Sequence, residues 1–257
     1  MVSDALVQIR THFESVYGRK PSNLAATLFE LLPEELRHPR VARLQCSSFL
    51  VERGLVRLER RALAAVRRLP GGMVDLGCGT GGLGRRIARR IGSPLVGVDV
   101  AISGGAAREG FIVGDMHDLP LSDSTFSLAI ANDVLHLVEE PVLALRETHR
   151  VLAPQATLIG SLYRYGGSVG RGRTREQWER VFGDAGFRRP RLFDVTREWR
   201  AVMTAKHQAR WSHRESLVRR FGPEAALHCD VSRQMLGIDM RIGFIAANER
   251  WEVIVRK

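Results

Sequence analysis

Residues 74–82 read VDLGCGTGG, a short apolar run that passes directly into a glycine-rich loop. Gly77, Gly79 and Gly82 satisfy G-x-G-x-x-G, the spacing of dinucleotide-binding loops, whereas Gly77, Gly79 and Gly81 satisfy the tighter G-x-G-x-G. In both patterns a strand ends, the glycines let the backbone approach a ligand, and the next helix begins with free N–H groups. The glycines alone therefore leave the choice between two classes of nucleotide cofactor open.

Acidic residues at the ends of neighbouring strands separate the two classes. Asp75 stands two residues before Gly77, where a carboxylate would repel a pyrophosphate but suits an ammonium or sulfonium group. Asp99 closes the strand LVGVDV and can accept hydrogen bonds from both hydroxyls of a ribose. Asp115 closes FIVGD and precedes Met116, a pair suited to an adenine amino group and ring. Only a cationic cofactor that carries an amino acid explains all of these positions.

Beyond the loop, short apolar strands alternate with helices. The strand patterns MVDLG, PLVGVDV, FIVGD, FSLAIAND and ATLIGSLY are separated by helical patterns such as GLGRRIARRIG and PVLALRETHRVL. Strand, helix and strand in this order predict parallel pairing with right-handed crossovers, so the fold class is α/β, doubly wound and mostly parallel. Ligands of such sheets bind at the carboxyl ends of the strands, where the acidic residues fall.

Two helical regions flank this core. Residues 1–70 are predicted to form an N-terminal helical cap, because apolar residues recur every three or four positions over 55–69 before Pro70-Gly71-Gly72. Residues 197–250, between the strand PRLFDVT and the closing strand WEVIVRK, are too long for a hairpin connection and carry helical patterns. We expect them to be a helical lid or substrate-binding insert on a core formed by 71–196 and 251–257.

The motifs VDLGCGTGGLG, VGVDV and VGDMHDLPLSDSTFSLAIANDVLHLVEEP, with the helix ending RVL before a fifth strand, resemble a known family in order and spacing. It is the class I S-adenosylmethionine-dependent methyltransferases, of the small-molecule type that includes enzymes acting on natural products. The resemblance covers roughly residues 70–196 and the closing strand at 251–255. It implies a seven-stranded Rossmann-like sheet, S-adenosylmethionine as cofactor and S-adenosylhomocysteine as product.

The resemblance also implies roles for individual residues. The cofactor-binding positions would be Asp75, Gly77, Cys78, Gly79 and Gly81 for the methionine part, Asp99 and Val100 for the ribose, Asp115 and Met116 for the adenine, and Asn132 beside the sulfonium and the acceptor. Only fifteen residues separate Asp99 from Asp115, and they include AISGG, so the helix usual there is predicted to be shortened or broken.

Methyl transfer from a sulfonium is an in-line displacement that depends mainly on positioning and on exclusion of water. It needs no metal ion, and some acceptors need no base. His136, in NDVLHLVEE after the fourth strand, is the candidate general base for a phenol or amine acceptor. The alternative is that His136 covers the cofactor without carrying a proton.

The candidate substrate-binding residues are aromatic or imidazole side chains. Tyr163 and Tyr165 follow the fifth strand, and Trp199, His207 and Trp211 are spaced by eight and four residues in the 197–250 insert. They could line an aromatic pocket or hold a cation against ring faces. The favoured alternative for the insert residues is that they pack the lid onto the body.

Composition bears on two further partners, nucleic acid and a membrane. The net charge of +11 and pI near 10.8 are compatible with nucleic-acid binding. However, Lys occurs only at positions 20, 206 and 257, and the many arginines are spread over several segments, as a GC-rich genome produces. The sequence contains no run of about 18 apolar residues, so no membrane span is predicted and a cytoplasmic protein is expected. Three scattered cysteines predict neither a disulfide framework nor a metal site.

The sequence thus predicts an S-adenosylmethionine-dependent methyltransferase that methylates an oxygen or nitrogen of a small molecule, in secondary metabolism. The alternatives are an RNA or peptide methyltransferase that uses the basic surface, and a non-catalytic S-adenosylmethionine-binding protein. The oligomeric state stays open.

Overall fold

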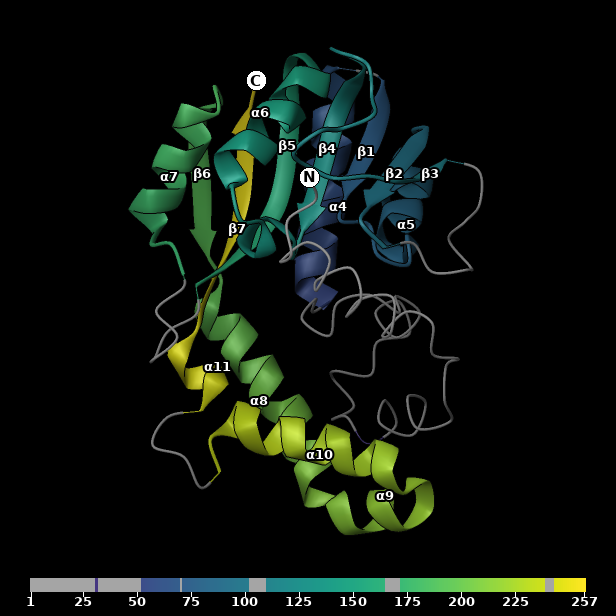
Figure 1. Cartoon of the computed structure of the whole chain (residues 1–257), viewed down its shortest axis with the longest axis vertical. Coiled ribbons are helices and arrows are strands. Elements are labelled where there is room, and N and C mark those ends of the chain that lie inside the picture. Colours follow the sequence, from purple (N-terminus) through teal and green to yellow (C-terminus); the bar gives the residue numbers. More distant parts are fainter. Residues whose placement is uncertain (1–30, 32–51, 70, 102–109, 165–171, 239–242) are drawn as a thin grey trace.

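The structure is a computed structural model that describes residues 31, 52–69, 71–101, 110–164, 172–238 and 243–257. Within them, seven strands form one sheet in the order β3-β2-β1-β4-β5-β7-β6 (Figure 1). The strands are β1 (Gly72–Leu76), β2 (Leu95–Asp99), β3 (Phe111–Val113), β4 (Phe126–Asn132), β5 (Leu152–Arg164), β6 (Arg188–Asp194) and β7 (Glu249–Arg256). β7 is antiparallel to both of its neighbours, and the pairs from β3 to β5 are parallel. The predicted doubly wound, mostly parallel sheet is confirmed.

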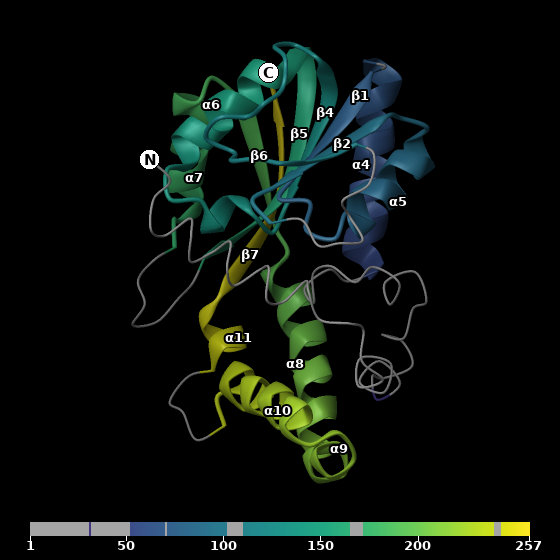
Figure 2. The same cartoon turned by 45° about the vertical axis from the view of Figure 1, so that its right-hand side comes forward.

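Helices cover both faces of the sheet, as Figure 2 shows. α4 (Glu52–Arg68) and α5 (Gly82–Ile91) lie on one face, and α6 (Pro141–Val151) and α7 (Arg175–Asp184) lie on the other. The apolar spacing over 55–69 forms α4, whose buried Leu55, Leu58 and Ala62 pack with Leu128 and Ile130 of β4. α4 is therefore part of the layered core. The rest of the predicted cap lies outside the described residues, apart from Leu31.

Register places polar side chains on the α4 face near the carboxyl edge of the sheet. Asn132 of β4 pairs with Ser161 of β5, which pairs with Glu252 of β7. Two residues further along, Tyr163 pairs with Arg250. Because side chains alternate between faces with a period of two, these residues share the face that α4 covers.

Four helices fill the connection between β6 and β7 and extend beyond the carboxyl edge (Figures 1 and 2). They are α8 (Thr196–Ser212), α9 (Arg214–Phe221), α10 (Pro223–Leu236) and α11 (Phe244–Ala247). They lie where the sequence predicts a helical insert, and the division into cap, core and lid stays a prediction. No helix in the described ranges is long and apolar enough to cross a bilayer.

Candidate functional site

The glycine loop joins β1 to α5 through left-handed backbone conformations. Gly77 has φ +64° and Gly81 has φ +70°. A Cβ atom at Gly77 would lie 2.5 Å from Cγ2 of Val134, and one at Gly81 would collide with the ring of Phe111. Only glycine fits both positions, because conformation and space exclude a side chain together. The predicted sequence of strand, glycine loop and helix is confirmed.

Asp75 lies at the bottom of this loop and is 3% exposed. Burial, reinforced by the charge of Asp99, raises the pKa of Asp75 to about 7. Its Oδ2 atom has no hydrogen-bond partner among the described residues. A Cβ atom at Gly84, in the first turn of α5, would overlap Oδ2 of Asp75. Sequence reasoning missed Gly84, although the extra glycine in GGLG was the available signal.

Asp99 ties the end of β2 to the loop. Its Oδ2 accepts a hydrogen bond from the Gly79 N–H at 2.7 Å, and its Oδ1 accepts one from the Ala101 N–H at 3.0 Å. Burial raises the pKa of Asp99, and these N–H groups oppose the shift. Cys78 is buried in the same loop, and burial raises the pKa of its thiol as well. The structure therefore brings together Asp75, Asp99 and the glycine loop; Val100 follows Asp99 directly.

The two residues predicted to contact adenine stand in different surroundings. The Asp115 carboxylate accepts a hydrogen bond from the His117 N–H at 2.9 Å and lies 2.7 Å from Nδ1 of His117. Met116 is buried in the core that also contains Leu119 and Leu135. Their roles toward adenine stay predictions. The helix predicted to be shortened or broken falls on residues 102–109, which lie outside the described residues.

A buried ion pair follows β4. Asp133 has φ +58°, and its Oδ1 lies 2.7 Å from Nη2 of Arg250, a residue that is 4% exposed. Asn132 Nδ2 donates to Asp133 Oδ2 at 3.0 Å, and Ser161 Oγ lies 2.7 Å from Asp133 Oδ1. The end of β4 is thus fixed by charge and hydrogen bonds from β5 and β7.

An aromatic row lies beside this ion pair. The rings of His136 and Tyr163 meet edge to face at 5.1 Å, and those of Tyr163 and Trp199 at 5.3 Å. The Arg250 guanidinium lies 4.5 Å from the centre of the Tyr163 ring. Burial lowers the pKa of His136 to about 4, outweighing the nearby charge of Asp133. His136 is therefore neutral at physiological pH and can accept a proton, but it is a weak base.

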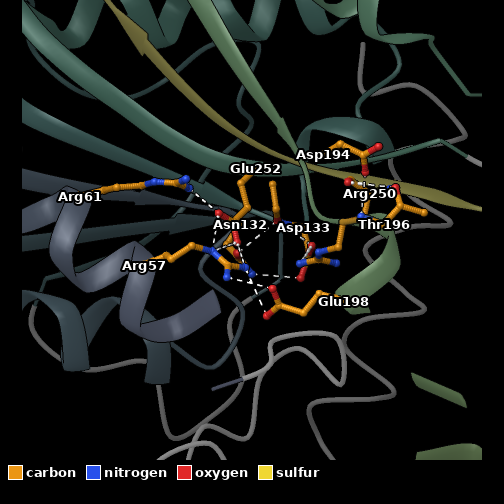
Figure 3. A network of polar contacts seen from close by, with 10 residues as sticks. Arg57, Arg61, Asn132, Asp133, Asp194, Thr196, Glu198, Arg250 and Glu252 are labelled. Atoms are coloured by element: carbon orange, nitrogen blue, oxygen red, sulfur yellow. Dashed lines mark hydrogen bonds and ion pairs between the residues drawn. The ribbon is translucent and has the colours of Figure 1, made fainter. Parts of the chain in front are cut away.

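A second charged cluster connects α4, α8 and β7 (Figure 3). The Arg57 guanidinium contacts both carboxylate oxygens of Glu252 and also contacts Glu198. Its shortest contact is the one with Glu252, at 2.7 Å. Arg61 forms an ion pair with the same Glu252. Sequence reasoning missed these four residues, as well as Asp133, Ser161 and Arg250.

Between the two charged groups lies a small cavity of about 30 Å³. Its walls come from α4, β4, β5, β7 and the start of α8: Gly54, Arg57, Leu58, Arg61, Asn132, Gly160, Ser161, Val195, Glu198, Trp199, Arg250 and Glu252. Of the predicted site residues, Asn132 and Trp199 line this cavity. Tyr163 does not line it, but its ring packs against Trp199 and Arg250, which do.

Two other predicted substrate-binding residues lie elsewhere on α8. His207 Nδ1 lies 3.0 Å from Ser232 Oγ of α10, and Trp211 packs with Leu217 and Phe221. A helix rises about 1.5 Å per residue, so Trp211 stands about 18 Å along α8 from Trp199. The structure does not bring His207 and Trp211 to the cavity, and Tyr165 lies outside the described residues. The described part of the chain contains no group of His, Cys, Asp or Glu able to hold a metal ion.

Comparisons with known proteins agree with this architecture. Residues 74–160 match a family model described as a methyltransferase domain. Norajmaline N-methyltransferase of Rauvolfia serpentina is 31% identical in an alignment over 102 residues that covers 35% of this chain and 35% of that protein. Malonyl-[acyl-carrier protein] O-methyltransferase of Halorhodospira halophila is 34% identical over 133 residues, 48% of this chain and 43% of that protein. The matches thus span between about a third and somewhat under half of these relatives.

Solved structures share the fold at lower identity. The [4+2]-cyclase SpnF superimposes with a TM-score of 0.68 at 22% identity, covering 100% of this chain and 97% of that one. Phosphoethanolamine N-methyltransferase 2 of Haemonchus contortus, solved with S-adenosyl-L-methionine, gives a TM-score of 0.58 at 14% identity, covering 99% and 74%.

Proposed function

We propose that this chain, which belongs to the class I S-adenosylmethionine-dependent methyltransferases, transfers a methyl group to an oxygen or nitrogen atom of a small molecule. The observation that carries the proposal is the buried carboxylate of Asp75 beneath the glycine loop, with one oxygen that has no partner among the described residues. When it is ionised, such a buried carboxylate favours a cation beside it, and the cofactor carries an ammonium group on its methionine part.

The residues present fit S-adenosylmethionine. The cofactor supplies a sulfonium-bound methyl group that an acceptor atom displaces in line. Asp75 and the loop of Gly77, Gly79 and Gly81 would hold its methionine part, and Asp99 its ribose. Asp99 can do so because each carboxylate oxygen has a second lone pair beside the one used by Gly79 or Ala101.

The acceptor is proposed to bind at the carboxyl edge, between Asn132 and the start of α8. The packing of Tyr163 of β5 against Trp199 and Met203 of α8 excludes water from this side, which favours the displacement. The names of the matched curated relatives specify N- and O-methyltransferases. The norajmaline enzyme supports a small-molecule acceptor, and we propose a role in natural product biosynthesis in the cytoplasm.

Calorimetric titration with S-adenosylhomocysteine and incubation with methyl-labelled cofactor test this function. A panel of phenols and amines is expected to include an acceptor that releases S-adenosylhomocysteine and takes up the label. Binding without product release with any acceptor would favour a non-catalytic cofactor-binding protein. Absence of binding would refute the cofactor assignment itself.

Replacing Asp99 with alanine is expected to weaken S-adenosylhomocysteine binding about 10- to 100-fold. The reason is the loss of hydrogen bonds from hydroxyls to a charged group, at about 1.5–3 kcal/mol. Calorimetry measures the change, and Asp230→Ala on the exposed face of α10 is the matched control. Unchanged affinity in Asp99→Ala would refute the ribose assignment.

Replacing His136 with phenylalanine is expected to lower turnover about 10²- to 10⁴-fold, the usual contribution of a general base. The aromatic contact with Tyr163 at 5.1 Å can be kept by the new ring, so cofactor affinity should stay the same. Single-turnover rates and calorimetry separate the two effects. Normal turnover would assign His136 to packing.

The net charge of +11 favours a second candidate function, the methylation of RNA or of a peptide. Binding of tRNA fragments that is tight and falls steeply with salt would support it, because phosphate contacts release counterions. Weak binding with a shallow salt dependence would support the small-molecule acceptor.

A further inference from the structure

Two buried donor groups near the carboxyl edge have no hydrogen-bond acceptor in the described part of the chain. Arg250 is 4% exposed; its Nη2 contacts Asp133, whereas its Nη1 is buried and makes no hydrogen bond there. Trp199 is 2% exposed, and its Nε1 is also buried and makes no hydrogen bond within the described part of the chain. Buried polar groups in folded proteins are almost always satisfied, so each of these donors calls for an acceptor.

Both residues line the same cavity. Arg250 belongs to β7 and Trp199 to α8, and the 30 Å³ cavity between them also touches Asn132 and Ser161. One water needs about 10–15 Å³ on this measure, so the space suits about two non-hydrogen atoms. The two oxygens of a group held by donors from these two elements would fill this space beside Asn132, where the acceptor is proposed to bind.

The charges around the cavity are balanced, so the unpartnered donors decide what the site accepts. Three arginines and two glutamates line it, and Asp133, which pairs with Arg250, is the third carboxylate. Glu252 is engaged by Arg57 and Arg61, and Glu198 is engaged by Arg57. Arg250 pairs with Asp133 through Nη2, and its Nη1 has no hydrogen-bond partner among the described residues.

We propose that Arg250 and Trp199 bind a carboxylate group of the acceptor, so that the methylated small molecule is a carboxylic acid carrying a nucleophilic oxygen or nitrogen elsewhere. The inference rests on the proposed function and deepens it by naming the acceptor class. The two oxygens of a carboxylate match two donors that approach from different elements, and Nη1 of Arg250 contributes a charge-assisted hydrogen bond.

Nuclear magnetic resonance of the full chain, saturated with S-adenosylhomocysteine, tests the site directly. The chain has four tryptophans, and the Trp199→Phe variant identifies the indole N–H signal of Trp199. Acetate, titrated through the millimolar range at constant ionic strength, is expected to shift this signal to lower field and to saturate. Acetamide, of the same shape without the charge, is expected to shift it at least tenfold less at equal concentration.

Trp178 provides an internal control. It is 1% exposed, and its Nε1 is also buried without a partner among the described residues, but it packs with Phe182 in the core away from the cavity. Its signal is expected to stay in place. No saturable shift at Trp199, an equal response to acetamide, or an equal shift at Trp178 would overturn the proposal.

Variants extend the test to affinity. Arg250→Lys keeps a positive charge for Asp133 but loses the planar fork, and is expected to weaken acetate binding at least tenfold. If that variant does not fold, the rise in melting temperature that acetate gives over acetamide provides a second measurement. Trp199→Phe should lose that difference and Trp178→Phe should keep it; retention by Trp199→Phe would contradict the site.

Cofactor binding is measured in the same samples. If S-adenosylhomocysteine fails to bind, the proposed function fails. If it binds while acetate has no specific effect, only the assignment of the acceptor class fails.

Discussion

Changing Asp133 to asparagine is expected to lower the free energy of unfolding by about 3–5 kcal/mol, the cost of leaving a buried charge without its counter-ion. Arg250 is 4% exposed and forms an ion pair with Asp133 at 2.7 Å, so its charge would stay buried in the variant. Asparagine has nearly the same shape and tolerates the φ of +58° at this position, so backbone strain does not contribute. Urea denaturation without cofactor measures the change.

Two controls separate burial from simple loss of an ion pair. Glu179→Gln breaks the exposed pair between Arg175 and Glu179 and is expected to cost less than about 1 kcal/mol. The double variant Asp133→Asn/Arg250→Met removes the isolated cation and is expected to recover part of the lost stability. A cost for Asp133→Asn no larger than that for Glu179→Gln would show that water reaches Arg250.

The part of the site that could be predicted from sequence is local in the chain. Asp75, the glycine loop and Asp99 fall within one strand, one turn, one helix and the next strand, so their spacing alone specifies that they meet. The rule that ligands bind at the carboxyl ends of parallel strands then locates the site. Gly84 could have been included, because a helix that starts above a buried carboxylate needs a residue without a side chain at the contact.

The second half of the site depends on contacts that no local pattern encodes. Arg57 and Glu252 lie 195 residues apart and meet because α4 packs on β4 and β5, and β7 pairs with β5. In a chain so rich in arginine, nothing in the sequence distinguishes a buried Arg250 from an exposed one. Spacing placed Trp199 and Trp211 on one helix, but the rise of that helix separates them by about 18 Å. Periodicity gives the face of a helix and not its distance from a site.

Cofactor affinity is expected to fall as pH drops below neutrality because of Asp75. Its pKa in the free protein is about 7, and the ammonium group of the ligand is bound by the ionised carboxylate. The affinity for S-adenosylhomocysteine should therefore decrease by up to about tenfold per pH unit below about pH 7 and level off above it. Calorimetry over about pH 6 to about pH 8 measures this slope. Asp75→Asn should bind about 10- to 100-fold more weakly at high pH, with no slope.

Stability of the cofactor-free protein should change with pH in the opposite direction. The pKa of Asp75 is raised above its ordinary value of 3.8, so the folded chain binds this proton more tightly than the unfolded chain does. Its contribution to stability is complete below the unfolded pKa and is lost as pH rises through about 7. The pKa of His136 is lowered from 6.5 to about 4, so between these values His136 adds a slope of the opposite sign, which the comparison with and without cofactor cancels. Melting temperatures measured with and without S-adenosylhomocysteine should thus diverge as pH rises in the native chain and run parallel in Asp75→Asn. A difference between the two melting temperatures that still changes with pH in the variant would assign the coupled proton to another group.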